Sequence, residues 1–477
     1  MKKIAVFLLG VMTLASCKNE EKKFQKETVA ESIVPVSNEA MESAVIYEAN
    51  IRQYSPEGTF DAFTKDIPQL KELGVKVIWL MPIYPISEKN RKATGDLSVE
   101  DIEDPAEREK YLGSYYAISD YTDVNPNFGT KEDLDELVAT AHENGMYVIL
   151  DWVANHTGWD HPWLEEHPEF YTQNAEGEPV DPLNPETGES WGWTDVADLN
   201  YDNKELWAAM TEDMEYWIVE HDIDGFRSDV AGEVPTEFWV QAVDKIKETK
   251  PVFMLAESEK KDLFHEAFDM GYNWEGHHIM NEMAQGKATV EAWDEYMQKI
   301  DTTYQKDDYL MNFVTNHDEN SWNGTVKERM GDASEAMVAF SYTIPGMPLI
   351  YSGQEYDMDK RLLFFEKDTI PRTKGKMWPI LAKLGELKNE SVALHGGKEA
   401  AEYIRLTTSE DEKVLAFERS KNDEKVIYLA NFSKEPVEFN LELQKELSVY
   451  LGKTDFKVQE NNTYNFGPWE YVVLRNK

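Results

Sequence analysis

Polar and charged side chains follow four short apolar runs of the chain, at the point where each run ends. They are Asp151, Asn155 and His156 after 147–150, Arg227 and Asp229 after 223–226, Glu257 after 252–255, and Asn316-His317-Asp318 after 310–314. Any one of them alone would suit a capping or surface position. Four such groups at strand ends, in a chain without a Gly-rich phosphate loop, predict acid–base chemistry on a neutral substrate.

Hydrolysis of a glycosidic bond is a reaction that this set of groups suits. It needs one carboxylic acid to protonate the leaving oxygen and one carboxylate to attack the sugar or to activate water. Carboxylates that are crowded together raise the pKa of one of their number, which then stays protonated and serves as the acid.

Eight β-rich runs have to position these groups. They are 45–47, 77–80, 147–150, 223–226, 252–255, 267–269, 310–314 and 349–351, and amphipathic stretches such as 132–143 and 204–220 lie between them. Strands that alternate with helices lie parallel, and eight such units close into a (β/α)8 TIM barrel whose strand C-termini share one rim. The alternative, an open doubly wound sheet, would need a Gly-rich phosphate loop after an early strand.

Two segments depart from the alternating pattern. Residues 157–200 are rich in Pro, Gly, Trp and Asp without a helical period, which predicts an inserted subdomain after strand 3. Strand-like runs separated by turns such as Asn422-Asp423 predict a C-terminal antiparallel β-sandwich domain over 385–477. The barrel itself is expected to span 44–384.

The first 17 residues have the pattern of an export signal. Two lysines precede an apolar run, 4–14, which is too short to span a bilayer, and Ala15-Ser16-Cys17 follows. Leu14-Ala15-Ser16-Cys17 resembles a bacterial lipobox, in which the cysteine is acylated. The alternative is an ordinary signal peptide with a chance cysteine.

We therefore expect a lipid on Cys17 as the only membrane anchor, and a flexible tether over 18–43. The protein would be exported across the inner membrane and anchored on the outer-membrane, periplasmic or cell-surface side. Cys17 is the single cysteine of the chain, which excludes an internal disulfide framework and a cysteine-based zinc site.

The formal net charge of −43 bears on the partners of the chain. A surface this negative repels phosphate backbones, so nucleic-acid binding is not expected. The same charge suits a neutral substrate.

The strand-end motifs resemble those of glycoside hydrolase family 13, the α-amylase family, over about residues 44–477. Asp151-x-x-x-Asn155-His156, Gly225-x-Arg227-x-Asp229, Glu257 and Asn316-His317-Asp318 stand in the order of the family's four motifs. The resemblance implies that Asp229 is the nucleophile, that Glu257 is the general acid/base, and that Asp318 binds the sugar 2- and 3-hydroxyls. It also implies a retaining hydrolase of α-1,4-linked glucans or maltooligosaccharides that works through a covalent glycosyl-enzyme.

The resemblance implies roles for the neighbours of these carboxylates. His156 and His317 would donate hydrogen bonds to the sugar, Arg227 would hold Asp229 ionised, and Asp151 would orient Arg227. Tyr116 would stack on the sugar ring, whereas Tyr115 suits the core. A permanent cation beside Asp229 predicts a depressed pKa for that carboxyl, and nearby negative charge predicts a raised pKa for Glu257.

A structural calcium ion is common in the resembled family. Asn155 and Asp198, the latter within Asp195-Val-Ala-Asp198-Leu-Asn, match two of the usual ligand positions. Gly232-Glu233 stand where the family often has a Lys-His pair that helps to hold calcium. The sequence therefore leaves calcium open, and no other cofactor is expected.

Two other functions compete with hydrolysis. A transglycosylase or isomerase, such as a trehalose synthase, would share the catalytic residues and differ in acceptor-side loops. A non-catalytic glycan-binding lipoprotein would usually have lost a catalytic carboxylate, and all three are present here. Trp191, Trp193, Tyr272 and Trp274 lie on strand-end loops, where they would either brace the loops or stack on outer glucose units.

Overall fold

The computed structural model describes residues 33–94, 97–184 and 187–476. The predicted export signal, Cys17 and most of the predicted tether lie outside these residues. No helix within the described ranges is long and apolar enough to cross a membrane.

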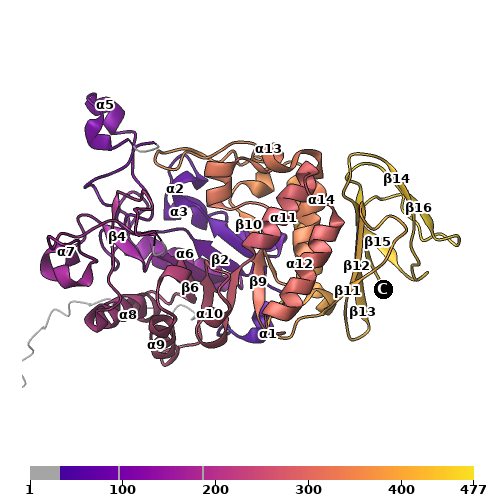
Figure 1. Cartoon of the computed structure of the whole chain (residues 1–477), viewed down its shortest axis with the longest axis horizontal. Coiled ribbons are helices and arrows are strands. Elements are labelled where there is room, and N and C mark those ends of the chain that lie inside the picture. Colours follow the sequence, from indigo (N-terminus) through magenta and orange to yellow (C-terminus); the bar gives the residue numbers. More distant parts are fainter. Residues whose placement is uncertain (1–32, 95–96, 185–186, 477) are drawn as a thin grey trace, which may run out of the picture. The chain divides into compact units, whose positions relative to one another are not determined.

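Eight parallel strands close into a barrel, as the alternating pattern predicts (Figure 1). In spatial order they are β1 (Ile46–Ala49), β2 (Val77–Leu80), β3 (Tyr147–Trp152), β6 (Gly225–Ser228), β7 (Phe253–Ala256), β8 (Met270–Tyr272), β9 (Tyr309–Asn312) and β10 (Met347–Tyr351). Hydrogen bonding between β10 and β1 closes the barrel, with Ile46 opposite Leu349.

Successive residues of a strand face opposite sides of the barrel wall. Ile46 and Ile149 belong to the cluster that fills the barrel, whereas Tyr47 and Val148 belong to the larger cluster between the strands and the helices. Both faces are apolar because both are covered, which explains why the strands read as continuous apolar runs.

The sixth strand lies three residues later than the sequence predicts. The predicted run, 267–269, ends the turn of α10 (Lys261–Glu266), where Phe268 N–H donates to Leu263 O at 2.9 Å. Asp269, just before β8, bonds to Met254 of β7: its N–H donates to Met254 O and its carboxylate accepts from Met254 N–H, both at 2.9 Å.

Helices surround the barrel, and several have clear capping signals. The longer ones are α6 (Lys131–Glu143), α8 (Lys204–Glu220), α9 (Thr236–Lys247), α11 (Trp274–Gln285), α12 (Val290–Thr303), α14 (Ser334–Thr343) and α15 (Met377–Glu390). Shorter helices are α2 (Ile51–Tyr54), α3 (Phe60–Thr64), α4 (Ile67–Leu70), α5 (Pro105–Arg108), α7 (Trp163–Glu166) and α13 (Val326–Met330). Thr130 and Asp133 form a capping box at α6, which satisfies backbone donors of its first turn.

The folded part of the chain begins before Ala44, the boundary expected from sequence. Helix α1 (Asn38–Glu42) lies within the predicted tether, and Ser37 caps it by accepting from Ala40 N–H at 3.2 Å. Met41 is buried in the cluster that fills the barrel. The last part of the predicted tether is therefore folded, and Met41 docks it on the barrel.

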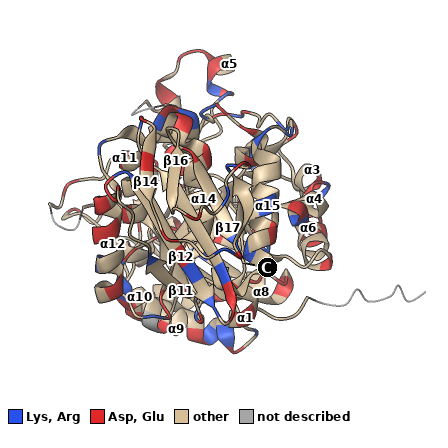
Figure 2. Cartoon of the chain, turned by 90° about the vertical axis from the view of Figure 1, so that its right-hand side faces the viewer, with Lys and Arg blue, Asp and Glu red and all other residues tan. Residues whose placement is uncertain are grey.

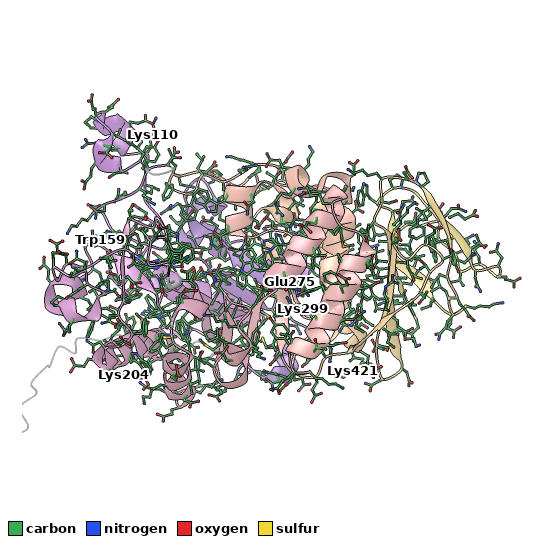
Figure 3. All side chains as sticks on the ribbon, viewed as in Figure 1. Lys110, Trp159, Lys204, Glu275, Lys299 and Lys421 are labelled. Atoms are coloured by element: carbon green, nitrogen blue, oxygen red, sulfur yellow. The ribbon has the colours of Figure 1, made fainter. Side chains whose placement is uncertain are left out.

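The segment between β3 and α8 forms the small insertion that its composition suggests. Its two strands, β4 (His156–Gly158) and β5 (Val196–Asp198), pair antiparallel, with His156 opposite Asp198. Trp159 of this segment, labelled in Figure 3, donates from Nε1 to Thr194 O at 3.0 Å.

The C-terminal region is antiparallel β-structure, as predicted. A five-stranded sheet contains β11 (Glu402–Arg405), β12 (Val414–Lys421), β13 (Glu424–Asn431), β17 (Tyr471–Arg475) and β15 (Ser448–Gly452) in that order. A second sheet pairs β14 (Val437–Asn440) with β16 (Thr463–Phe466), and one apolar cluster joins the two sheets. Arg419 of β12 is fully buried and donates to Thr343 O at the end of α14 at 3.0 Å, which ties this region to the barrel.

Charged residues of both signs are interspersed over the face that Figure 2 shows. Ion pairs such as Lys299–Glu275, labelled in Figure 3, connect neighbouring helices, here α12 and α11. Exposed pairs of this kind contribute little to stability.

Candidate active site

A cavity of about 360 Å³ opens at the C-terminal ends of the barrel strands. Residues that line it include Tyr116, His156, Asp229, Glu257, His317 and Asp318. All six are among the site residues predicted from sequence. Parallel strands bring their C-terminal residues to one rim, which is why positions 202 residues apart, from Tyr116 to Asp318, meet here.

The guanidinium of Arg227, at the end of β6, is fully buried beneath the cavity and contacts three carboxylates. Its Nη1 donates to Asp151 Oδ1 and to Asp229 Oδ1, both at 2.8 Å. Its Nη2 lies 2.8 Å from Glu257 Oε2, an ion-pair contact without hydrogen-bond geometry. Arg227 therefore joins the predicted nucleophile and the predicted acid through one rigid group.

Asp151, at the end of β3, is fully buried and is held by two groups besides Arg227. Besides Arg227, Trp79 Nε1 donates to its Oδ2 at 3.1 Å, and the Tyr116 hydroxyl donates to the same atom at 3.2 Å. Tyr272, one of the aromatic residues singled out in the sequence, accepts from Arg227 Nε through its hydroxyl at 3.1 Å. The orientation of Arg227 is thus fixed from both sides.

Burial raises the pKa of Asp229 to about 6, although Arg227 works in the opposite direction. The depressed pKa expected from sequence is therefore wrong, because the loss of water around the carboxylate outweighs the neighbouring cation. Burial raises the pKa of Glu257 further, to about 7, with Arg227 again opposing and Asp229 and Asp318 adding to the rise. The raised pKa of Glu257 agrees with the prediction from sequence.

Val230, between the nucleophile position and the following turn, has a backbone φ of +36°. A β-branched residue rarely adopts this left-handed conformation, so the local backbone is strained. In this conformation Val230 N–H donates to Glu257 Oε2 at 2.9 Å. The strained residue thus joins the loop of Asp229 to the carboxyl of Glu257.

The two predicted histidines differ in charge. Burial lowers the pKa of His156 to about 3, so its imidazole is neutral. Burial also lowers the pKa of His317, but Asp318 and Glu48 raise it more, to about 9, so its imidazole is a cation. The site therefore offers one neutral and one charged ring to a substrate.

Glu48 of β1 is a site residue that the sequence analysis missed. It is fully buried, and its Oε1 lies 2.5 Å from His317 Nδ1, while the other ring nitrogen of His317 lies 2.7 Å from the Tyr116 hydroxyl. The available signal was an acidic residue inside an otherwise apolar strand, which is rare unless the charge is paired.

Asn155 and Asp198 lie in neighbouring parts of the insertion, where Leu199 N–H donates to Asn155 O at 3.1 Å. The Asn155 side-chain amide contacts His156 Nδ1 at 3.2 Å. Within the described ranges, no group of three or more His, Cys, Asp or Glu side chains could hold a metal ion. Asn155 and Asp198 would supply one amide and one carboxylate oxygen of the six to eight oxygen ligands that calcium takes, so a calcium ion at this place stays a prediction.

Three other aromatic residues have clear positions. Tyr115 is buried in the core, as expected, and donates to Asn50 Oδ1 at 3.1 Å. Trp193 lines the cavity, whereas Trp274 packs against Tyr272 with ring centroids 5.4 Å apart.

A model of the α-amylase catalytic domain matches residues 22–424, most of the chain. The chain belongs to the α-amylase family. A second model, the C-terminal domain of maltogenic amylase, matches residues 404–473, the region of the antiparallel sheets.

Individual relatives agree with this membership. An α-amylase of Haloarcula japonica is 24% identical over 84% of this chain, which spans only 57% of that relative's length. The structure of a noncanonic maltogenic α-amylase from Thermotoga neapolitana aligns with a TM-score of 0.75 and 27% identity, over 91% of this chain and 97% of that one. An α-amylase structure from Lactobacillus plantarum aligns with a TM-score of 0.78 and 28% identity, over 92% and 100%.

The contact of Glu48 with His317 can be tested by replacing Glu48 with Gln. The amide keeps the shape but removes the charge, so the pKa of His317 should fall and kcat/KM should drop roughly tenfold, the difference between a charge-assisted and a neutral hydrogen bond. The measurements are an NMR titration of His317 and the kinetics of hydrolysis.

A matched control is Glu355→Gln. Glu355 is also a fully buried acid just beyond a barrel strand, but it bonds to Tyr47 at 2.6 Å and does not touch His317. If Glu48→Gln and Glu355→Gln behave alike, with the His317 titration unchanged, Glu48 has only a structural role.

Proposed function

We propose that this protein is a retaining α-glycoside hydrolase that acts on α-1,4-linked glucans or maltooligosaccharides through a covalent glycosyl-enzyme. The observation that carries the proposal is the arrangement around Arg227, whose contacts with Asp229 and Glu257 join two carboxyls of different pKa at one cavity. Membership of the α-amylase family supports it, as do the names of the maltogenic and α-amylase relatives.

The reaction follows from the protonation order. Glu257, with the higher pKa, donates its proton to the leaving oxygen while the Asp229 carboxylate attacks the anomeric carbon. The glycosidic bond breaks and a bond to Asp229 forms. Glu257, now a carboxylate, then takes a proton from the water that releases the sugar and restores both groups.

The surrounding residues hold the sugar. Asp318 and the charged ring of His317 face the cavity together, with His317 Nε2 and Asp318 Oδ2 3.4 Å apart, and suit a pair of adjacent hydroxyls. Tyr116 presents its ring to the same space, and His156 adds a neutral hydrogen-bonding group. No metal ion enters the proposal.

The nucleophile assignment is tested with maltoheptaose. The protein should release shorter maltooligosaccharides or glucose, and Asp229→Ala should reduce the rate by at least ~10³-fold because the step that breaks the bond is lost. Chromatography of the products over time gives both results, with Asp307→Ala at an exposed surface position as the control.

The products also separate hydrolysis from its alternatives. Longer chains or a disaccharide of altered linkage would show that the enzyme is a transferase or an isomerase. If the Asp229→Ala variant keeps the full rate of the parent, the assignment is contradicted.

The pH dependence follows from the two pKa values. Activity should fall below pH about 6 as Asp229 gains a proton, and above pH about 7 as Glu257 loses one, so kcat/KM should be bell-shaped between these values. A glycosyl fluoride, whose leaving group needs no proton, should lose the alkaline limb and keep the acid limb. An alkaline limb that is identical for both substrates contradicts Glu257 as the acid.

We also propose that Cys17 carries a lipid that anchors the protein after export to the outer-membrane, periplasmic or cell-surface side. The support is the sequence alone: a short apolar run followed by Leu14-Ala15-Ser16-Cys17. Cells fed an alkyne-bearing fatty acid should label the wild-type protein and not a Cys17→Ala variant. Equal labelling of both would exclude this site.

A further inference from the structure

Two tryptophans, Trp191 and Trp322, are the only exposed ones among the described residues, at 45% and 51% of their surface. Leaving a tryptophan in water forgoes the free energy of burying a large apolar ring. Both lie beside the catalytic cavity, where exposed apolar surface commonly marks a ligand-binding groove.

Trp322 ends a continuous row of rings that begins inside the site. Tyr116 stacks on His317 with centroids 5.5 Å apart, and Phe364 lies parallel to Tyr116 at 6.4 Å and 7°. Trp322 contacts Phe364 at 5.0 Å. Tyr116, Phe364 and Trp322 all line the cavity, so the row leads from Asp318 toward solvent.

Two loops carry this row, the turn 319–323 and the loop 360–364, and hydrogen bonds hold them together without a ligand. Trp322 lies in the π-helical turn Glu319–Asn323, directly after Asp318. Asn320 of that turn donates to Lys360 O at 3.0 Å and accepts from Leu362 N–H at 2.8 Å. Because the two loops are held together, the aromatic surface needs little ordering when a ligand binds.

Trp191 belongs to a second aromatic surface, on the insertion between β3 and α8. It stacks on Trp193 with centroids 6.1 Å apart and an angle of 21°. Trp193 lines the cavity and lies 5.8 Å from the ring of His156. Lys92, from the segment after β2, donates to Gly192 O and so holds the loop between the two tryptophans.

These surfaces suit an uncharged, ring-shaped ligand unit. The exposed part of each surface is aromatic. The nearby cation, Lys92, has its Nζ 3.9 Å from Asp195 Oδ1, and this carboxylate offsets the charge of the lysine. Glucose rings have apolar C–H faces that pack on aromatic rings while their hydroxyls stay in water. A chain of glucose units that enters the site would meet these rings next.

We propose that Trp322 with Phe364, and Trp191 with Trp193, are two sugar-binding platforms that stack on glucose units of a linear maltooligosaccharide beyond the units that contact Asp229 and Glu257. This inference rests on the proposed function and adds a chain-length preference to it. Short substrates engage the catalytic centre alone, and longer ones gain the contacts with the platforms.

The test compares maltotriose with maltoheptaose in the variants Trp322→Ala and Trp191→Ala. Each should raise KM for maltoheptaose roughly 3–10-fold, as expected for the loss of one aromatic stacking contact, and leave kcat and the values for maltotriose nearly unchanged. Trp322→Phe should recover part of the loss because it keeps a ring. Ile404→Ala, at a 42% exposed apolar residue on β11, is the matched control and should have no effect.

Calorimetric titration of both sugars in the Asp229→Ala background distinguishes the failure of the platforms from the failure of the proposed function. If the wild type hydrolyses maltoheptaose but removal of either tryptophan changes binding of both sugars equally or not at all, the platforms are wrong and the function stands. If the wild type hydrolyses neither sugar, yet the tryptophans strengthen binding of the longer one, the function is wrong and the platforms stand. If neither sugar binds, both are overturned.

Discussion

A cation without access to water is the constraint on which this site depends. Arg227 has no exposed surface, and such a charge is tolerated only when carboxylates and hydrogen bonds replace the lost water. Asp151, Asp229 and Glu257 do so, each with one oxygen 2.8 Å from a guanidinium nitrogen. The same contacts that make the burial of Arg227 tolerable fix the positions of both reacting carboxyls.

The barrel provides the framework for this cluster. Strands β3, β6 and β7 are neighbours, with Asp151 opposite Arg227 and Arg227 opposite Leu255, so the charged side chains meet at one rim. Trp79 and Tyr272 flank the guanidinium with ring centroids 4.9 and 5.5 Å from its carbon. These rings exclude water from the guanidinium. Burial also raises the pKa of Asp229 to about 6 and that of Glu257 to about 7, which suits a nucleophile and an acid near neutral pH.

Much of this arrangement could be predicted from sequence because it obeys a local rule. An apolar run followed by charged residues identifies the end of a parallel strand, and the barrel brings such ends together. Asp151, Arg227, Asp229 and Glu257 were all found in this way. The sixth strand was misplaced because Ala267 and Phe268 continue the apolar pattern, whereas the N–H groups of both donate to Leu263 O in the turn that ends α10.

Other features depend on contacts that a sequence does not display. Glu48 reads as an isolated acid, and only closure of the barrel between β1 and β10 brings it beside His317. The direction of the Asp229 pKa shift depends on how completely water is removed, which competes with the charge of Arg227. Helix α1 docks through the buried Met41, and Ile33, Val36 and Ala40 pack against the same cluster.

Asp229 is expected to form a covalent bond to the sugar, with Arg227 holding its carboxylate and Glu257 supplying the proton. A 5-fluoro-glycosyl fluoride forms the glycosyl-enzyme quickly and releases it slowly, so the trapped intermediate can be digested and sequenced by mass spectrometry. We expect one added glycosyl group, on the peptide that contains Asp229, and none in Asp229→Ala. A glycosyl group on Glu257 or Asp318, or rapid turnover of an unmodified enzyme with inversion at the anomeric carbon, would contradict it.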